Sequence, residues 1–240
     1  MSNLKIGSSC NHCFFDDGMG SDAPTVEFEL TDGNFYPWTC SRGHENHLIL
    51  ANKRFELLLE IGLRAARDGY PREFVVAFAG ALERFYEFAL RVLMQAESVD
   101  AAVRFRNFNA LWKQVRKHSE RQMGAFQAIW LNSFDQQPAM LDPNDVSFRN
   151  NVVHNGLIPS KADAIAFCQA AYDAIFDNGS VLLDKRRRAV EWVGHVANFE
   201  AGREAVERKK IITTITLVTP FSLILAPELQ VRANIAQLVG

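Results

Sequence analysis

The sequence predicts a mainly α-helical protein with a small β-unit at its amino end and a short β segment near its carboxyl end. Between residues 47 and 208, apolar side chains recur three and four positions apart almost throughout, which is the spacing of amphipathic helices. Residues 26–30 instead alternate between polar and apolar types, and residues 211–218 are rich in β-branched side chains, as is typical of strands. We therefore divide the chain into three parts: residues 1–46, 47–210 and 211–240.

The amino-terminal part contains an expected β-hairpin. Residues 26–30 form its first strand, Asp32-Gly33 is a pair that favours a type I′ turn, and residues 35–39 return as the second strand. The returning strand would bring Cys40 towards the Cys10-x2-Cys13 turn. Because so short a part buries little apolar surface, we expect a bound metal ion to stabilise it.

Zn²⁺ prefers four thiolate or imidazole ligands in a tetrahedron, and two tight turns of this kind supply them. The sequence therefore predicts a structural zinc site with the ligands Cys10, Cys13, Cys40 and His44. His44 is chosen because residues 40–44, Cys-Ser-Arg-Gly-His, resemble the second turn of zinc ribbons. His47 is the alternative fourth ligand, whereas His12 would strain the first turn. The competing interpretation is a set of reduced thiols without a metal.

The middle part is expected to form a helical bundle. The expected helices cover residues 51–67, 71–96, 99–134 and 143–155, followed by one that begins at Ser160 and one from 180 to about 209. The helix at 71–96 is the most apolar and should lie at the centre of the bundle. Cys168 falls on an apolar stripe, so we expect a buried core thiol.

The carboxyl-terminal part is expected to contribute strands. Residues 211–218 predict one strand, and residues 221–225 predict a second strand or the edge of the first. A lone hairpin is only marginally stable in water. We therefore expect the tail to join the amino-terminal strands in one small β-unit.

Local signals mark both ends of the helix at residues 143–155. Asp142 can cap its amino end, and Pro143 suits the first helical position, where its missing N–H costs nothing. Gly156 supplies a left-handed exit. His154 then falls in the last turn, where the negative end of the helix dipole favours an imidazolium.

Three polar residues of this helix form a candidate site for a phosphate. Asn150 and His154 are four residues apart and share a face, whereas Arg149 must bend round to join them. A permanent cation, an amide and a titratable imidazole together suit binding a phosphate and moving a proton beside it.

This stretch resembles the HEPN superfamily, small helical bundles whose signature is Arg, four to six residues and then His. Arg149 and His154 are separated by four residues here. The capping box at residues 160–163, which opens the next helix after a Gly/Pro break, is also similar to the end of a HEPN domain. Residues 81–87 are similar to the opening helix of that family.

The resemblance implies a metal-independent endoribonuclease. The 2′-OH of RNA would attack the adjacent phosphorus and leave a 2′,3′-cyclic phosphate and a 5′-OH. Arg149 would hold the non-bridging oxygens, His154 would transfer a proton, and Asn150 would orient the phosphate. Glu83 would be an accessory residue that approaches the motif.

The resemblance also implies a homodimer in which two copies of the motif helix pool their residues about a twofold axis. Many such proteins act as toxins or in antiviral defence, so an antitoxin or another defence-system protein is an expected partner. In some family toxins the partner modifies a tyrosine two residues after the histidine. That position is Gly156 here, which puts this form of regulation in doubt.

Charge places a limit on how RNA could bind. The net charge of −2 gives no bulk attraction to nucleic acid, so RNA would need a local basic patch. One candidate is a basic stripe on the helix at 99–134, which is formed by Lys113, Arg116, Lys117 and Arg121. A solvated helix face is the plainer interpretation of that stripe. We find no signal peptide and no membrane-spanning apolar run, and expect a cytoplasmic protein.

The competing hypothesis is a non-catalytic HEPN-like module that dimerises and binds a nucleotide or a partner protein, with the zinc ribbon as an adaptor. In that case His154 would cap backbone carbonyls at the helix end, and Arg149 would pair with a carboxylate. A zinc-ribbon regulator that binds DNA fits less well, because no expected helix combines basic residues with a recognition pattern.

Overall fold

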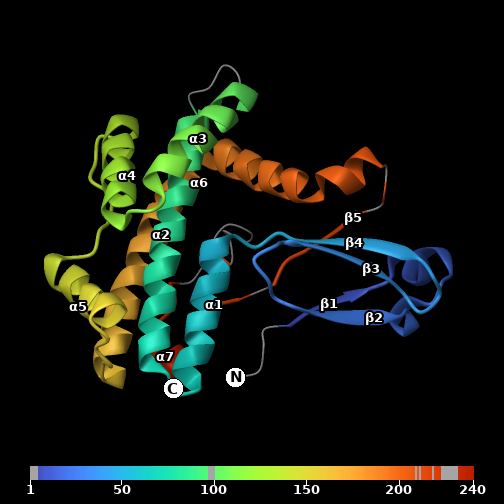
Figure 1. Ribbon diagram of the computed structural model, residues 1–240, viewed down its shortest axis with the longest axis horizontal. Helices are drawn as coiled ribbons and strands as arrows, with labels where there is room; N and C mark the ends of the chain where they lie inside the picture. Colours follow the sequence, from blue (N-terminus) through green and yellow to red (C-terminus); the bar gives the residue numbers. More distant parts are fainter. Residues whose placement is uncertain (1–4, 97–100, 209, 211, 218, 223–231) are drawn as a thin grey trace. The chain divides into compact units, whose positions relative to one another are not determined.

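Helices make up most of the chain, and small sheets lie near its amino end, as the sequence predicts (Figure 1). The computed structural model describes residues 5–96, 101–208, 210, 212–217, 219–222 and 232–240. The chain divides into unit 1, with residues 1–52 and 194–218, and unit 2, with residues 53–193 and 219–240. Across the described ranges, the helices are too short or too polar to cross a membrane.

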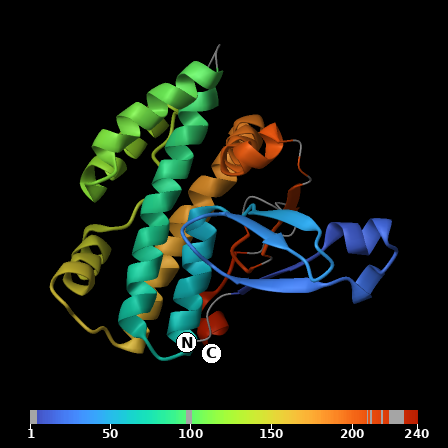
Figure 2. The same ribbon diagram turned by 45° about the vertical axis from the view of Figure 1, so that its right-hand side comes forward.

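Unit 1 contains two small sheets (Figure 2). Its strands are β1 (Lys5–Ser9), β2 (Thr25–Glu29), β3 (Phe35–Thr39), β4 (Glu45–Leu50) and β5 (Ile212–Ile215). β1 pairs antiparallel with β2, and η1 (His12–Asp16) and η2 (Gly20–Asp22) lie in the connection between them. The second sheet has the order β3-β4-β5, with β4 antiparallel to β3 and parallel to β5.

The predicted hairpin between residues 26–30 and 35–39 is wrong, although both segments are strands. β2 pairs with β1, and β3 pairs with β4. A type I′ turn needs positive φ at both central residues, and Gly33 does not have it. The Tyr36 hydroxyl instead donates a hydrogen bond to the Gly33 carbonyl and accepts one from the Thr31 N–H. The connection is therefore an open loop between two sheets.

The carboxyl-terminal strand joins the amino-terminal unit, as expected. β5 pairs with β4 in the register His47 to Ile212 through Leu50 to Ile215. The prediction that the helical part begins at residue 47 is wrong, because residues 45–50 form strand β4. Of the second tail segment expected at 221–225, Phe221 is buried in unit 2. Residues 223–225 lie outside the described residues.

Unit 2 is a helical bundle built around one long helix. Its helices are α1 (Arg54–Arg67), α2 (Pro71–Ala96), α3 (Ala101–Val115), α4 (Ser119–Ser133), α5 (Pro143–His154), the part of α6 (Lys161–Glu207) up to residue 193, and α7 (Ile235–Val239). α2 packs against α1, α3, α4 and α5, as expected for the central helix (Figure 1). Six apolar residues that recur at helical spacing along α2 are buried: Phe74, Phe78, Leu82, Phe85, Phe88 and Leu93. Cys168 is fully buried in the same core, as predicted.

Two helix boundaries differ from the prediction. The segment expected as one helix at 99–134 is α3 and α4, separated by a turn in which His118 is extended, with φ −133° and ψ 111°. The turn lets α4 fold back onto α2 and bury Phe126 and Trp130. Conversely, no break occurs near residue 179, because α6 continues to Arg186, where non-helical dihedral angles mark a kink.

Candidate active site and candidate metal centre

The motif helix α5 begins and ends as its sequence predicts. The Asp142 carboxylate accepts hydrogen bonds from the backbone N–H groups of Asn144, at 2.7 Å, and Asp145, at 2.9 Å. At the other end Gly156 has a φ of +74°, a left-handed conformation that side chains with a Cβ rarely adopt. These two caps set the first and last residues of α5.

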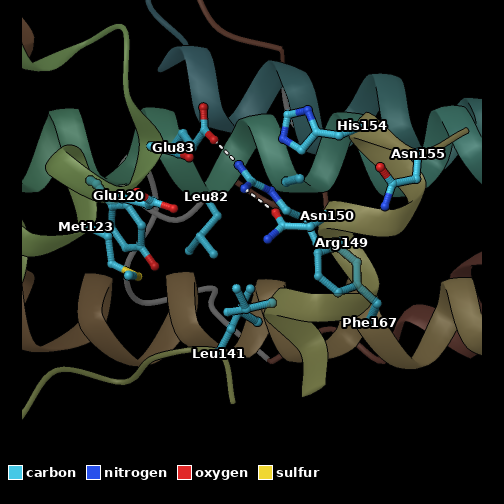
Figure 3. Close-up of a pocket in the computed structure, with 14 residues that line it drawn as sticks. Leu82, Glu83, Glu120, Met123, Leu141, Arg149, Asn150, His154, Asn155 and Phe167 are labelled. Atoms are coloured by element: carbon cyan, nitrogen blue, oxygen red, sulfur yellow. Dashed lines mark hydrogen bonds and ion pairs between the residues drawn. The ribbon is translucent and has the colours of Figure 1, made fainter. Parts of the chain in front are cut away.

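α5 borders a cavity of about 270 Å³ together with residues of α2, α4 and α6 (Figure 3). Leu82, Met123, Leu141 and Phe167 supply part of its apolar wall. Its polar wall includes Glu83, Ser119, Glu120, Arg149, Asn150 and His154. The structure therefore brings all three motif residues and the accessory Glu83 to one cavity.

Arg149 is held in place by two neighbouring side chains. Its Nη2 donates to Oε1 of Glu83 in an ion pair, and its Nη1 donates to Oδ1 of Asn150 at 3.0 Å. The side chains of Arg149 and Glu83 are only 17% and 26% exposed. Since a guanidinium has five N–H donors, these two bonds use two of them, and about three remain for other acceptors.

His154 is exposed at the last turn of α5 and also lines the cavity. Figure 3 shows its ring on the same side of α5 as the Arg149 guanidinium. Among the described residues, His154 makes no hydrogen bond to a backbone carbonyl, so it does not cap the helix end. Its two ring nitrogens are therefore available for proton transfer to or from a bound molecule.

Tyr86 adds a functional group that the sequence analysis missed. It lines the same cavity, is 4% exposed, and stacks on Phe126 at a centroid separation of 4.7 Å. Burial raises the pKa of its hydroxyl, so the phenol stays neutral at physiological pH and can donate a hydrogen bond. Tyr86 follows Glu83 by three residues and therefore shares its helix face, so its place in the cavity could have been predicted from the sequence. Ser119 and Glu120 had no such signal, because α4 reaches the cavity only by folding back.

The predicted basic stripe does not exist as one helix face. Lys113 is in α3, Arg116 and Lys117 lie in the turn, and Arg121 is in α4. The spacing of the four residues puts them on one face only if they belong to a single continuous helix. The break between α3 and α4 therefore separates them. Within the described residues, none of these four lines the cavity beside Arg149.

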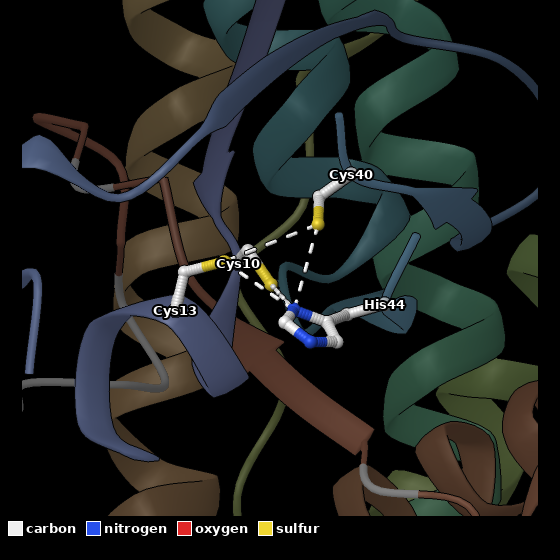
Figure 4. Close-up of side chains that lie close together, drawn as sticks. All are labelled: Cys10, Cys13, Cys40 and His44. Carbon is white, nitrogen blue, oxygen red and sulfur yellow. Dashed lines mark hydrogen bonds between the residues drawn. The ribbon is translucent and has the colours of Figure 1, made fainter. Parts of the chain in front are cut away.

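A second cluster brings the four predicted metal ligands together in unit 1 (Figure 4). The ligand atoms of Cys10, Cys13, Cys40 and His44 all lie within 4.8 Å of one another. Nδ1 of His44 is 3.8 Å from the Cys10 sulfur, 3.3 Å from the Cys13 sulfur and 3.7 Å from the Cys40 sulfur. All three cysteines are buried and reduced.

These separations fit the edges of a tetrahedral metal site. Zn–S bonds of about 2.3 Å and Zn–N bonds of about 2.05 Å place the donor atoms roughly 3.5–3.8 Å apart. The Cys13 and Cys40 sulfurs are 4.0 Å apart, and the sulfur–nitrogen distances bracket the expected value. The set of three thiols and one imidazole is therefore compatible with a structural zinc ion.

The second ligand turn is shaped by its backbone. The Cys40 N–H donates to the His44 carbonyl at 3.0 Å, and the Arg42 N–H points at the Cys40 sulfur at 3.4 Å. Gly43 has a φ of +86°, which a residue with a Cβ would adopt only with strain. This turn delivers Cys40 and His44 to the same point in space.

The two other candidate histidines are not part of this cluster, although the His12 ring lies 5.1 Å from the His44 ring. His47 is in the middle of β4, where its ring stacks on Phe35 at 5.9 Å. His12 pairs with Asp16 at 2.8 Å through its Nδ1. The geometry therefore favours His44 as the fourth ligand.

The thiols of the cluster differ in acidity. Burial, followed by hydrogen bonds with the Cys10 and Cys40 thiols, raises the pKa of Cys13 to about 12. Burial also acts to raise the pKa of Cys40, but hydrogen bonds from the backbone of His44 and Arg42 outweigh it and lower that pKa. A cation at the centre of the cluster would stabilise all three thiolates.

Comparisons with protein-family models, with curated proteins and with solved structures found no match to this chain. The function is therefore inferred from the two sites themselves.

Proposed function

We propose that this protein is a metal-independent endoribonuclease of the HEPN type whose active site is the cavity beside α5. The observation that carries the proposal is that Arg149, Asn150, His154 and Glu83 line one cavity. Glu83 is on α2, and the motif residues are on α5. The spacing within the motif alone could not bring Glu83 beside Arg149, so this contact comes from the packing of the two helices. A fixed cation beside an exposed imidazole is what phosphodiester cleavage by internal attack requires.

The reaction begins with a phosphodiester of RNA whose non-bridging oxygens accept hydrogen bonds from Arg149. The 2′-oxygen attacks the adjacent phosphorus as its proton leaves, and the bond from phosphorus to the 5′-oxygen breaks. The products are a 2′,3′-cyclic phosphate and a 5′-OH, so atoms and charge balance without an added water. His154 serves as the acid or base that moves a proton at one of these oxygens.

Glu83 acts on the reaction through Arg149. Its carboxylate accepts a hydrogen bond from Nη2 of the guanidinium, and Asn150 accepts one from Nη1. These two contacts fix the orientation of the guanidinium and of its remaining N–H groups. A cation positioned before substrate arrives stabilises the charge that builds on phosphorus with little reorganisation. Glu83 is thus a positioning residue in this scheme.

A complete site would use two chains. One α5 supplies one imidazole, whereas cleavage uses both a base at the 2′-OH and an acid at the 5′-oxygen. A twofold homodimer that joins two α5 helices would supply both. In that assembly the protein would act as a toxin or an antiviral effector, controlled by a partner protein.

Zinc has a structural role in this proposal. Cys10, Cys13, Cys40 and His44 would hold one ion in a closed site with no open position for a substrate. The ion would stabilise unit 1, whose sheets are small, and would take no part in cleavage.

The experiment that tests the proposal compares wild type with His154→Ala and Asn155→Ala on a labelled RNA, with EDTA present to remove unbound divalent ions. His154 and Asn155 are neighbours, both exposed and both on the cavity wall, so Asn155→Ala is a matched control. We expect His154→Ala to lose about 100-fold in rate. Asn155→Ala should retain most of the activity.

The second candidate function is a non-catalytic module that binds a nucleotide or a partner protein. The ion pair between Arg149 and Glu83 favours a non-catalytic module, because in such a module Arg149 is expected to pair with a carboxylate. The two candidates differ in whether RNA is cleaved. Arg149→Ala would leave Glu83 without its cation and lower the melting temperature in both cases. An enzyme would in addition lose a cleavage activity that the wild-type protein has, whereas a non-catalytic module would show no cleavage before or after the substitution.

A further inference from the structure

Unit 1 carries a cavity of about 410 Å³ on the sheet formed by β3 and β4. The residues that matter to its chemistry are Phe35, Pro37, Glu45, His47, Arg208 and Lys210. Arg208 and Lys210 follow the end of α6, and the other four are on the two strands. All six belong to unit 1, so the cavity is formed within one compact unit.

Side-chain rings form one wall of this cavity. Phe35 and Pro37 are two positions apart on β3 and therefore face the same side of the sheet. His47 pairs with Pro37 across the two strands, which places it on that side as well. The rings of Phe35 and His47 are stacked, with centroids 5.9 Å apart and an interplanar angle of 21°. The result is a ring-lined surface on which another planar group can stack.

Cations lie next to these rings. Lys210 forms an ion pair with Glu45, and both side chains are well exposed to solvent. The Lys210 ammonium is the largest cause of a lowered pKa at Glu45, and His47 and Arg208 lower it further. Two permanent cations, Arg208 and Lys210, thus lie close to this carboxylate, and both line the cavity beside the rings.

One polar atom under the rings has no protein partner. Nδ1 of His47 is buried and makes no hydrogen bond to any described residue. A buried ring nitrogen without a partner costs free energy.

Rings beside cations are the features that bind single-stranded nucleic acid, in which unpaired bases stack on aromatic side chains while phosphates contact basic ones. A peptide added as a strand would need the outer edge of β3. Pro37 lies in the middle of that strand and has no N–H to donate, which disfavours strand addition. A duplex would keep its bases inside its own stack and away from the rings.

We propose that the surface formed by Phe35, Pro37, His47, Arg208 and Lys210 binds single-stranded nucleic acid. Bases stack on Phe35 and His47, and phosphates contact Arg208 and Lys210. This binding goes beyond the proposed cleavage and needs neither Arg149 nor His154. RNA and DNA share the chemistry that the surface recognises, because neither stacking nor phosphate contact involves the 2′-OH.

The test uses the full-length chain carrying His154→Ala, so that cleavage cannot obscure binding. Fluorescence anisotropy would measure the affinity for labelled oligo-U RNA, oligo-dT DNA and a duplex, each of about ten nucleotides, a length within the usual site size. Binding of both single strands, more tightly than the duplex, supports the proposal. Equal binding of the duplex, or no binding of either strand, overturns it.

Two variants with matched controls locate the site. Phe35→Leu keeps an apolar side chain but removes the aromatic face, and should weaken binding about tenfold, the scale of one lost base stack. Phe15→Leu is its control, because Phe15 is an exposed phenylalanine elsewhere in unit 1. Lys210→Gln should reduce the slope of log affinity against log salt by about 0.7, the loss of one phosphate contact with a single strand. Lys5→Gln, at another exposed ion pair, should leave the slope unchanged.

A third variant should bind more tightly, which misfolding cannot imitate. Glu45→Gln removes the carboxylate that competes with phosphate for Lys210, and should tighten binding about two- to fivefold. Circular dichroism and metal content would verify that each variant is folded. If Glu45→Gln weakens binding, or if folded Phe35→Leu binds as tightly as its control, the proposed surface is wrong.

Discussion

Glu83 on α2 and Arg149 on α5 form an ion pair although they are 66 residues apart in the sequence. Both side chains are largely buried at the wall of the cavity. The pair fastens the motif helix to the central helix of the bundle and fixes the guanidinium beside Asn150. In the proposed enzyme this pair would have both a structural and a functional role, and substitutions can separate the two roles.

Glu83→Gln should keep the shape of the side chain but remove its charge. We expect it to lower the free energy of unfolding by roughly 1–2 kcal/mol, between the values for exposed and buried pairs. A double-mutant cycle with Arg149→Ala, followed by urea denaturation, should show a coupling of similar size. A coupling near zero would mean that the pair contributes nothing, and that Glu83 does not position Arg149.

The metal cluster should hold about one zinc ion per chain, measured by elemental analysis of the purified protein. His44→Ala should release most of it, because Nδ1 of His44 faces all three sulfurs. His47→Ala is the matched control and should retain the metal, since its ring is stacked on Phe35 instead. Zinc retained in His44→Ala but lost from His47→Ala would show that the ligand set is wrong.

Asp145 in the first turn of α5 should make stability depend on pH. Burial, and then the charge of Asp142, raise its pKa in the folded protein. The folded state therefore holds this proton more tightly than the unfolded chain, and its contribution to stability is present at low pH and lost as pH rises through the raised pKa. Asp145→Asn should stabilise the protein by up to about 0.5 kcal/mol at neutral pH.

That gain should shrink as the pH falls and disappear once the pH is well below about 4, the ordinary pKa of an aspartic acid. Urea denaturation of both proteins at neutral and acidic pH would measure it. A gain of the same size at both pH values would show that ionisation of Asp145 is not its cause.

The proposed dimer can be tested through Asn151, an exposed residue of α5. If two α5 helices meet at a twofold axis, Asn151→Cys should form an intermolecular disulfide under mild oxidation, seen on a non-reducing gel. The native cysteines should not interfere, because all four are buried. Ile61→Cys, at an exposed position of α1, is the control. Equal crosslinking of both variants, or a monomer by light scattering at tens of micromolar, would argue against the composite site.

Local signals explain which parts of the fold were predictable. The ends of α5 depend on a capping carboxylate, a proline and a left-handed glycine, all within a few residues, so the sequence indicated them directly. The clustering of the four candidate metal ligands was also predictable, because their spacing reflects two short turns. The central position of α2 followed from its many apolar residues, most of which are buried.

Contacts between distant segments explain the failures. Residues 26–30 have the pattern of a strand, but nothing in that pattern identifies residues 5–9 as their partner. The turn at 116–118 contains no glycine or proline, so the fold of α4 against α2 could not be inferred. Tyr86, Ser119 and Glu120 were missed as cavity residues, the last two because of this turn. The surface around Phe35 and Lys210 was missed because it forms only when β3 and β4 pair near the end of α6.

The central claim is that the cavity beside α5 cleaves RNA by attack of the 2′-OH, and the chemistry of the product ends tests it most directly. Wild-type protein would be incubated with labelled RNA in EDTA, the zinc content of the same sample would be measured, and the fragments would be analysed by mass spectrometry. We expect fragments that end in a 2′,3′-cyclic phosphate and begin with a 5′-OH, at a rate that falls about 100-fold in His154→Ala. Fragments with a 5′-phosphate, or cleavage that His154→Ala leaves unchanged, would contradict the account.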